Sequence, residues 1–470
     1  MSMDIATQYA EYVTELEYED VPDDVIDYAK KLTLDAIGIS IGAKSRAESS
    51  DSFVNGVDSL ADGGDATVFA TGEKIEPEYA ALLNGALIHS LDYDDTHRAA
   101  SHHPGAPVIP AAIATAETVG RDVSGKELLT AIVAGYEISC RLGQAINPAS
   151  HYERGFHGTA TVGTFAATAA AAKIAGLSAE ELVNAFGLNG SQASGSQQYL
   201  ANGSWNKRAH PGLSAHSAIL AVRFAEAGFY GSASPIEGED GFFNAYSDDP
   251  KPELATKGLG EEFELTQTGI KPYPCCRYMH APLDGVFSLI DEHSIGASDV
   301  ERVVVELAEP GVNLVGRPTE RKENPKSFVD AQFSMQFGVA LALNVGEATV
   351  DSFLEWCDSY GEEFSQIMEA TEVRSSDEVD DVYPEKWCAN VVIETTDGTF
   401  EEFVEYANGE PENRMSWDDA IEKYESLTVD LDASAADGLL ESVRSLEAIS
   451  VADLTAPVTE DPRTEAIADD

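Results

Sequence analysis

The first 273 residues repeat their hydrophobic positions with a helical period. Many windows are rich in alanine, and alternating runs of β-branched residues are few, a pattern that favours helices over strands. Proline or aspartate opens several of these segments and glycine closes several others, as is common at helix ends. We therefore expect helices at Asp24–Ile41, Glu78–Leu91, Pro110–Val119, Lys126–Leu142, Gly158–Ala175, Ala179–Gly187 and Pro211–Ala227.

The pattern changes after residue 274. Val300–Leu307 resembles a strand, and Asn390–Tyr406 contains two alternating runs separated by Asp397 and Gly398. An Asp-Gly pair between two alternating runs is a strong signal for a tight hairpin turn. A helical pattern at Ser327–Leu343 lies between these strands, so we predict that this part is α+β.

Helical periodicity returns at Trp417–Leu427 and Ala435–Leu446, which indicates that the chain rejoins its first part. The predicted fold is therefore mainly α, with a large all-helical domain and a smaller α+β domain inserted before the C-terminal helices. The polar, acidic end of the chain is expected to be frayed. The expected boundaries are 1–268 with 410–455 for the helical domain, 269–409 for the inserted domain and 456–470 for the acidic tail.

The charge balance of the chain is extreme. Its 470 residues contain 29 Lys and Arg against 83 Asp and Glu, a formal net charge of −54. Such a charge excludes a general attraction to nucleic acid or to anionic membranes. Because the acidic residues are dispersed, they indicate a solvated surface suited to a salt-rich cytoplasm, where charges are screened over about 3 Å at 1 M ionic strength.

The five cysteines are odd in number and have no C-x-x-C spacing, so we expect neither a disulfide framework nor a zinc site. The first residues lack the basic and apolar regions of a signal peptide. The uncharged stretch His157–Ala172 ends at Lys173 and is shorter than the ~20 residues of a membrane span. The sequence therefore predicts a soluble, cytoplasmic protein.

Histidines and carboxylates gather in one short segment. Four of the ten histidines, His89, His97, His102 and His103, fall within fifteen residues. Three carboxylates, a tyrosine and a threonine lie among them, in the segment Leu91–Thr96. Carboxylates alone would be typical of a solvated loop, but the histidines and hydrogen-bonding side chains beside them favour a functional site.

Metal binding is not the first interpretation of this segment. Neither the D-x-[DN]-x-[DN]-G order of a calcium loop nor the H-E-x-x-H pattern of a zinc protease is present. An Asp/His metal site of another geometry stays open. A metal hydrolase would use Asp94, Asp95, His97 and His102.

His157 directly precedes a long alanine-rich helix. The helix dipole disfavours a positive charge at that end, so the ring is expected to be neutral and able to act as a base. The alternative is a histidine that only caps the helix.

Lys207, Arg208 and His210 are expected just before another helix, where two cations and free backbone N–H groups would form a receptor for carboxylates. The alternative is a surface pair that balances nearby acid, but the preceding run from Gly190 to Asn206 carries no charge. The glycines at 190 and 195 resemble a phosphate loop only loosely and lack the G-K-[ST] element, which excludes nucleotide binding.

Lys271, Arg277 and His280 come together in sequence at the predicted domain junction. Domain interfaces commonly bind small ligands. The vicinal thiols of Cys275 and Cys276 between them are expected to be packed, with no part in chemistry.

Several of these segments, taken in order, resemble the MmgE/PrpD family. No single motif is specific, but their joint order and spacing cover nearly the full chain. The segments are Leu34–Gly38, Asn84–Ala86, Leu91–Thr96, His103–Pro104, Gly155–His157, Gly190–Gly195, Lys207, His210–Gly212 and Lys271–Pro274.

The resemblance implies a large helical domain, a smaller α+β lid that interrupts it, a homodimer, and an active site between the two domains. It also implies activity on compact polycarboxylates without an iron–sulfur cluster, as in 2-methylcitrate dehydratases, cis-aconitate decarboxylases and an iminodisuccinate epimerase. The decarboxylase branch carries a tyrosine at the position of Phe337, and the missing hydroxyl weakens the case for a decarboxylase without selecting a dehydratase.

The resemblance marks six positions as functional, with Arg277 and His280 as nearby candidates. His103 and His157 would be the general acid and base, Lys207 and Lys271 would hold carboxylates, and Asp92 with Thr96 would orient a histidine or a hydroxyl. Arg208, Arg277 and His280 are the expected substrate-binding residues.

The predicted function is a lyase that needs no metal and no cofactor and converts 2-methylcitrate to 2-methyl-cis-aconitate. Its expected partners are a small polycarboxylate and a second copy of the chain, without nucleic acid or membrane. The alternatives are cis-aconitate decarboxylation, epimerisation of iminodisuccinate, and binding of a polycarboxylate without catalysis.

Overall fold

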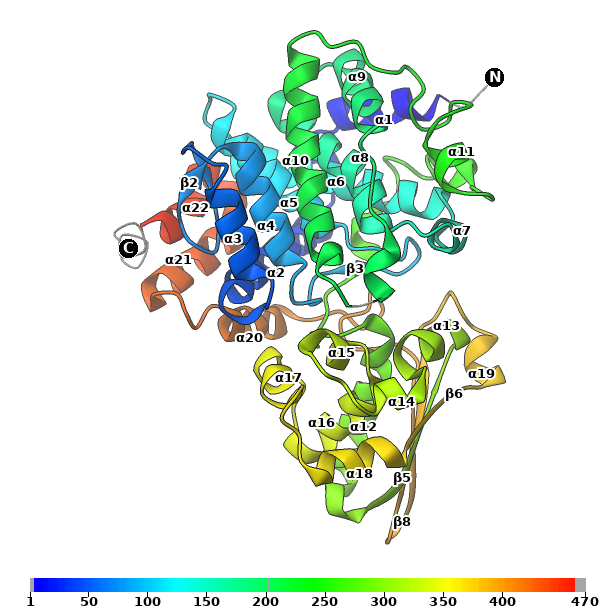
Figure 1. Cartoon of the computed structure of the whole chain (residues 1–470). Coiled ribbons are helices and arrows are strands. Elements are labelled where there is room, and N and C mark those ends of the chain that lie inside the picture. Colours follow the sequence, from blue (N-terminus) through cyan, green and yellow to red (C-terminus); the bar gives the residue numbers. More distant parts are fainter. Residues whose placement is uncertain (1–3, 202, 461–470) are drawn as a thin grey trace. The chain divides into compact units, whose positions relative to one another are not determined.

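The computed structural model describes residues 4–201 and 203–460 (Figure 1). Contacts divide the chain into two compact units. Unit 1 combines the described parts of Met1–Ser90, Asp94–Gly269 and Ser416–Asp470, and unit 2 combines Leu91–Tyr93 with Ile270–Met415. Unit 1 is built from helices and unit 2 contains the larger sheet. The expected fold class, mainly α with a smaller part that contains a sheet, is confirmed.

Helix α8 forms the centre of unit 1. It spans Gly158–Ala175, and every residue from Gly158 to Ala172 is buried. Its alanine-rich sequence lets α5, α6 and α10 pack closely against it. The helices of unit 1 are α1 Ile5–Glu15, α2 Asp23–Arg46, α3 Ser50–Asp58, α4 Pro77–Ile88, α5 Gly105–Thr118, α6 Gly125–Ala145, α7 Pro148–Glu153, α8, α9 Ala179–Asn189, α10 Asn206–Glu226, α11 Phe242–Tyr246, α20 Trp417–Leu427, α21 Ala433–Arg444 and α22 Val451–Thr459.

The ends of these helices follow local capping rules. Ser178 accepts a hydrogen bond from the backbone N–H of Glu181 at the start of α9, and the Glu181 carboxylate accepts one from the Ser178 N–H in return. Gly176 ends α8 in the left-handed region at φ 76°, a conformation that glycine adopts without strain. The predicted bounds of α8 are confirmed.

Two predicted helix starts are wrong. Pro110 and Pro211 lie inside α5 and α10, which begin at Gly105 and Asn206. An interior proline costs roughly 3 kcal/mol in an exposed helix. Here burial outweighs that cost, because residues 105–116 of α5 are all buried. As a consequence Lys207, Arg208 and His210 lie within the first turns of α10 and not ahead of it.

Strands are short in unit 1. Four of two residues each are described there: β1 Ala66–Thr67 pairs with β2 Lys74–Ile75, and β3 Thr96–His97 pairs with β4 Thr268–Gly269. The second pair opposes Thr96 to Gly269. It therefore fixes the backbone of the segment in which histidines and carboxylates gather.

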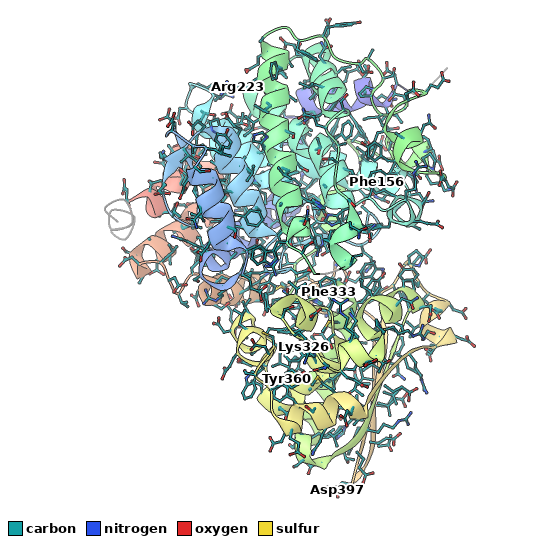
Figure 2. All side chains as sticks on the ribbon, in the orientation of Figure 1. Phe156, Arg223, Lys326, Phe333, Tyr360 and Asp397 are labelled. Atoms are coloured by element: carbon teal, nitrogen blue, oxygen red, sulfur yellow. The ribbon has the colours of Figure 1, made fainter. Side chains whose placement is uncertain are left out.

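A four-stranded sheet organises unit 2, in the order β6-β5-β7-β8. The strands are β5 Val300–Leu307, β6 Thr371–Ser375, β7 Ala389–Thr395 and β8 Gly398–Val404. β5 is parallel to β6 and antiparallel to β7. The predicted strand and hairpin are confirmed, and Figure 2 shows Asp397 at the turn between β7 and β8.

The helix predicted at Ser327–Leu343 is two helices. α15 spans Phe328–Gln332 and α16 spans Met335–Val345. The break occurs because the Ser334 hydroxyl accepts a hydrogen bond from the N–H of Phe337 and starts a new helix. α12, His280–His293, packs against β7 and β8.

The predicted tail begins too early. Helix α22 continues to Thr459, with Leu454 and Val458 buried, because these side chains pack into unit 1. Residues 461–470 of the predicted tail lie outside the described residues.

No single helix in the described parts of the chain is long and apolar enough to cross a membrane. α16 and α17 (Val350–Trp356) meet that length and composition only as a pair, with a bend of 103° between them.

Candidate active site

The candidate site starts where α4 ends. His89 is the C-cap of α4. The chain then runs through Leu91–Tyr93, which pack with unit 2, and returns to unit 1 at Asp94. Asp92 has a φ of +52°, a left-handed conformation that is strained for a residue with a side chain. This sharp path brings Asp94 back beside His89.

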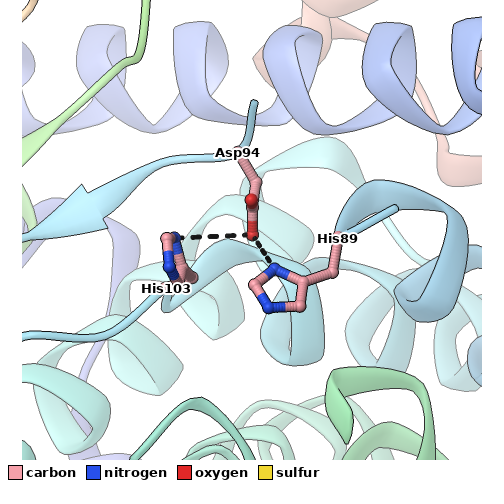
Figure 3. A group of neighbouring side chains, drawn as sticks. All are labelled: His89, Asp94 and His103. Atoms are coloured by element: carbon pink, nitrogen blue, oxygen red, sulfur yellow. Dashed lines mark hydrogen bonds and ion pairs between the residues drawn. The ribbon is translucent and has the colours of Figure 1, made fainter. Parts of the chain in front are cut away.

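His89, Asp94 and His103 form a compact group in unit 1 (Figure 3). The distance from His89 Nδ1 to Asp94 Oδ2 is 2.7 Å, and that from His103 Nδ1 to the same oxygen is 3.7 Å. His89 Nε2 is buried and has no hydrogen-bond partner among the described residues. Because a carboxylate only accepts, His89 Nδ1 carries a hydrogen.

Backbone and side-chain oxygens fix the ring of His103. Its Nδ1 lies 2.7 Å from the carbonyl oxygen of Asp95 and 3.3 Å from Thr96 Oγ1. A carbonyl only accepts, so Nδ1 carries a hydrogen. The structure therefore places the predicted residues Thr96 and His103 together.

His157 is the N-cap residue of α8, as the sequence predicts. Its Nδ1 lies 2.9 Å from Nδ1 of His210. Burial, followed by the charges of His210 and His89, holds the pKa of His157 well below its usual value of 6.5. The prediction of a neutral ring is confirmed, but burial is the main cause and not the helix dipole.

His210 completes this pair from the second turn of α10. Burial, then the charges of His89 and Lys207, lowers the pKa of His210 to about 4. Both rings of the pair are therefore neutral at pH 7. The ring of Tyr199 lies against both, with centroids at 5.8 Å from His157 and 5.9 Å from His210.

Two cations lie in the first turn of α10. The charge of Lys207 contributes to the lowered pKa values of His157 and His210, which places its ammonium near both rings. Arg208 is buried and donates a hydrogen bond of 3.2 Å to Ser49 Oγ. Lys207 is only partly buried, so it is the more accessible cation for an anionic ligand.

In unit 2, the predicted residues Asp92 and Lys271 bind each other. Lys271 Nζ lies 2.6 Å from Asp92 Oδ1 and 2.8 Å from the Asp92 carbonyl oxygen, and both side chains are buried. The contact stabilises the strained backbone of Asp92. The assignment of Lys271 to a substrate carboxylate stays a prediction.

Arg277 and His280 are engaged within unit 2. The guanidinium of Arg277 lies 2.7 Å from Glu410 Oε1 and donates from Nη1 to His280 Nδ1 at 3.0 Å. The side chain of His280 is fully buried. A substrate carboxylate would have to displace Glu410, so this geometry favours a structural role for the group.

The spacing of His89, Asp94 and His103 also bears on metal binding. Their ligand atoms lie within 4.8 Å of one another, a spacing that a cation could bridge. However, the 2.7 Å hydrogen bond between His89 and Asp94 already uses two of these atoms. The arrangement is that of a hydrogen-bonded carboxylate–imidazole dyad.

The residues of the alternative metal hydrolase site contact separate partners. Asp95 accepts a hydrogen bond of 2.7 Å from the Tyr136 hydroxyl, and burial raises the pKa of Asp95 to about 8. His97 contacts Glu264 at 3.1 Å, and His102 contacts Ser139 Oγ at 2.7 Å. These side chains do not converge on one ion.

Sequence reasoning missed the roles of His89 and His210. Both appear in its motifs, but nothing in their spacing shows that His89 binds Asp94 or that His210 binds His157. A usable signal was the position of His89 at a helix end, five residues before Asp94.

Unit 1 thus gathers neutral imidazoles, one carboxylate and one accessible ammonium. Rings with a free nitrogen can take or give a proton. An ammonium beside them can hold a carboxylate. The chemistry available is proton transfer on an anionic substrate.

Comparison with known proteins identifies the family. A model of the MmgE/PrpD N-terminal domain matches residues 7–255, and a model of the MmgE/PrpD C-terminal domain matches residues 273–448. These matches cover most of the chain and confirm the resemblance found in the sequence.

Several relatives are similar over most of their length. The cis-aconitate decarboxylase-like protein oryM of Aspergillus oryzae is 29% identical over 464 residues, which cover 94% of each chain. The cis-aconitate decarboxylase of Aspergillus terreus is 28% identical over 373 residues, 76% of this chain and 75% of its own. The human cis-aconitate decarboxylase is 29% identical over 370 residues, 76% and 73% of the two chains. The chain therefore belongs to the MmgE/PrpD family and is a lyase of that family.

Proposed function

We propose that this lyase acts on a small tricarboxylate and uses His103 and His157 of unit 1 for proton transfer, without a metal or cofactor. The observation that carries the proposal is the set of fixed imidazoles. His103 is held at Nδ1 by a carbonyl and His157 at Nδ1 by His210. Each ring is therefore held in one orientation, and we assign the exchange of a proton with the substrate to its Nε2.

Charge supports an anionic substrate. In a chain with a net charge of −54, Lys207 is a partly buried cation beside the imidazole pair. Its ammonium would hold one carboxylate and stabilise the charge that develops during the reaction. The roles of Asp92, Lys271, Arg208, Arg277 and His280 in substrate binding stay predictions.

The reaction we propose first is decarboxylation of cis-aconitate, because the relatives described above carry that name. In this reaction the carbon–carbon bond to one carboxylate breaks, carbon dioxide leaves, and the electron pair remains with the substrate. A proton from an imidazole nitrogen then forms the new carbon–hydrogen bond. One proton is consumed per turnover.

Phe337 lies among aromatic rings of unit 2. Its ring is fully buried in unit 2 and packs against Phe353, Tyr360 and Phe364, with Tyr360 labelled in Figure 2. The expectation that this position separates the two reactions stays a prediction.

Dehydration of 2-methylcitrate is the second candidate, and the presence of two anchored imidazoles favours it. Dehydration needs a base for the proton next to a carboxylate and an acid for the departing hydroxyl. His103 and His157 would supply both, each contributing the ~10²–10⁴-fold of general acid–base catalysis.

A product screen tests the proposal. The purified chain would be incubated at molar salt with cis-aconitate, 2-methylcitrate, citrate and iminodisuccinate, with and without a chelator, and products identified by NMR. We expect carbon dioxide release from cis-aconitate that survives chelation. Turnover of 2-methylcitrate alone would select the dehydratase, and binding without turnover of any substrate would overturn the assignment as an enzyme.

A further inference from the structure

His157 and His210 are joined directly, nitrogen to nitrogen. Their Nδ1 atoms lie 2.9 Å apart and their ring centroids 5.1 Å apart. A neutral imidazole has one N–H, so one ring must donate and the other accept. The donating ring then has a bare Nε2, and the accepting ring carries its hydrogen on Nε2. The tautomers of the two rings are therefore coupled.

The surrounding backbone fixes this pair. The N–H of His157 donates to the carbonyl oxygen of Gly195 at 2.9 Å. Gly195 has a φ of +153°, and a Cβ added there would overlap Ala160 and lie 3.5 Å from Nδ1 of His210. Only glycine fits this approach without displacing a neighbour. The loop that contains Gly195 therefore holds both rings in position.

The two rings differ in their access to solvent. His157 is 2% exposed, whereas His210 is 7% exposed. Both rings are buried, and we assign the exchange with water to His210 because it is the more exposed of the two. The titratable groups that face the pair from neighbouring elements are His89, His103, Tyr152, Tyr199 and Lys207.

We propose that His210 is a positioning residue that relays a proton between solvent and His157. The inference rests on the proposed function, because it assigns to His157 a proton that goes to or comes from the substrate. Nothing in the family match or in the named relatives requires such a role for His210.

The relay balances for decarboxylation. His157 gives its Nε2 proton to the substrate carbon while its Nδ1 takes the Nδ1 proton of His210, and His210 takes a proton from water at Nε2. Both rings are neutral before and after, and one solvent proton has reached the substrate. After the product has left, the reverse exchange with water restores the first tautomers. In dehydration the proton moves along the same path in the opposite direction, from His157 through His210 to water.

Two substitutions distinguish a proton relay at His210 from a purely structural role of this residue. In His210→Asn the amide lies near the place of Nδ1 and keeps a hydrogen bond to His157, but it cannot pass a proton on. In His210→Ala both functions are lost. The control is His216→Asn on the same helix, where the ring is half-buried against Tyr79 at 5.9 Å. Circular dichroism would check that each variant folds.

The test measures kcat and KM on the substrate that the wild-type chain converts. We expect kcat of both His210 variants to fall at least about tenfold, within the range of general acid–base effects, with KM within about threefold. The control should match the wild type. In His210→Ala, added imidazoles should restore turnover, and the restored rate should depend on the pKa of the added base, which a purely structural role would not produce.

The outcomes are distinct. If His210→Asn keeps the wild-type kcat, or if rescue is independent of the basicity of the added imidazole, His210 is not a relay. If the wild-type chain converts no tricarboxylate, the proposed function fails instead. Restored turnover that follows basicity supports the relay whichever of the two reactions is found.

Discussion

At the scale of residues, His103 and His157 reach one cluster from separate segments of unit 1. The ring of His89 links them, with centroids 4.8 Å from His103 and 5.8 Å from His157. We expect His103→Gln and His157→Gln each to bind the non-reactive tricarballylate but to lose about 100-fold or more in kcat. The double variant should be little worse than the poorer single, because residues that act as a unit are not additive. Losses that multiply would contradict an acid–base couple.

Asp95 gives a pH dependence of stability. Its pKa is raised from 3.8 to about 8, chiefly by burial, so the folded state holds a proton that the unfolded state loses above pH 4. The stability from this proton is complete below pH 4 and is lost as the pH rises through about 8. In Asp95→Asn this loss is absent.

The measurement is the free energy of unfolding by denaturant at pH 5 to 8. As the pH rises, we expect the free energy of unfolding of Asp95→Asn to increase relative to that of the wild type. The increase is at most about 1.4 kcal/mol per pH unit. The exposed Asp65→Asn is the control and should follow the wild type. Parallel curves for Asp95→Asn and wild type would show that the buried carboxyl is not protonated.

The sequence predicts which residue types are chemical, but not their partners. His103 and His157 were predicted from motifs, and the structure gives each a fixed ring. Arg277 was expected to bind substrate, yet its partner Glu410 stands 133 residues later, and nothing local predicts that ion pair. Partners of this kind depend on long-range folding, so sequence patterns alone do not reveal them.

At the scale of elements, α4 and α10 cross at two glycines. A Cβ on Gly85 would lie 2.9 Å from the Cα of Gly212, and a Cβ on Gly212 would overlap the carbonyl oxygen of Leu82. The two backbones therefore approach closely. This crossing sets the distance between His89, at the end of α4, and His210, near the start of α10.

Gly212→Ala should therefore lower both stability and activity. Because the added methyl meets backbone, the helices must separate, at a cost of roughly 1–3 kcal/mol. The control is Gly56→Ala in α3, where nothing lies within 4 Å and where alanine should stabilise by about 0.5–1 kcal/mol. Denaturant unfolding and kcat measure the two effects. A Gly212→Ala variant as stable as wild type would mean that the crossing is not close.

Hydrophobic periodicity and turn motifs in the sequence predict the elements whose ends depend on local signals. β5 and α20 have their predicted bounds, since a run of valines marks the strand and a serine cap marks the helix. The predicted starts of α5 and α10 are wrong, because a proline inside a buried helix gives the same sequence signal as a helix boundary. In the structure, tertiary burial keeps Pro110 and Pro211 inside their helices.

At the scale of the whole molecule, the net charge of −54 opposes compaction. Unscreened repulsion between carboxylates destabilises the folded state, and salt reduces it. We expect the thermal unfolding midpoint to rise by more than about 5 °C between about 0.05 M and about 2 M potassium chloride. A constant midpoint across this series, measured by circular dichroism, would contradict adaptation to a salt-rich cytoplasm.

Exposed hydrophobic side chains concentrate on one stretch of unit 1. Among the described residues nine large hydrophobic side chains are exposed, and six of them lie between residues 200 and 230. That stretch contains three Lys and Arg but only one Glu, and this local positive balance lessens the repulsion of a second copy of an acidic chain. The six are Leu200, Trp205, Leu213, Phe224, Phe229 and Tyr230.

We therefore expect the homodimer implied by the sequence to form through this stretch. Leu213 and Phe224 are 49% and 52% exposed on α10, and burying such side chains favours association. At molar salt, light scattering should give twice the 50.2 kDa of one chain for wild type. Leu213→Glu with Phe224→Glu should give a monomer, whereas Leu60→Glu, at an exposed leucine elsewhere, should stay dimeric. Two carboxylates buried against their copies would repel one another strongly. A dimer that survives the double substitution would therefore place the interface on another face.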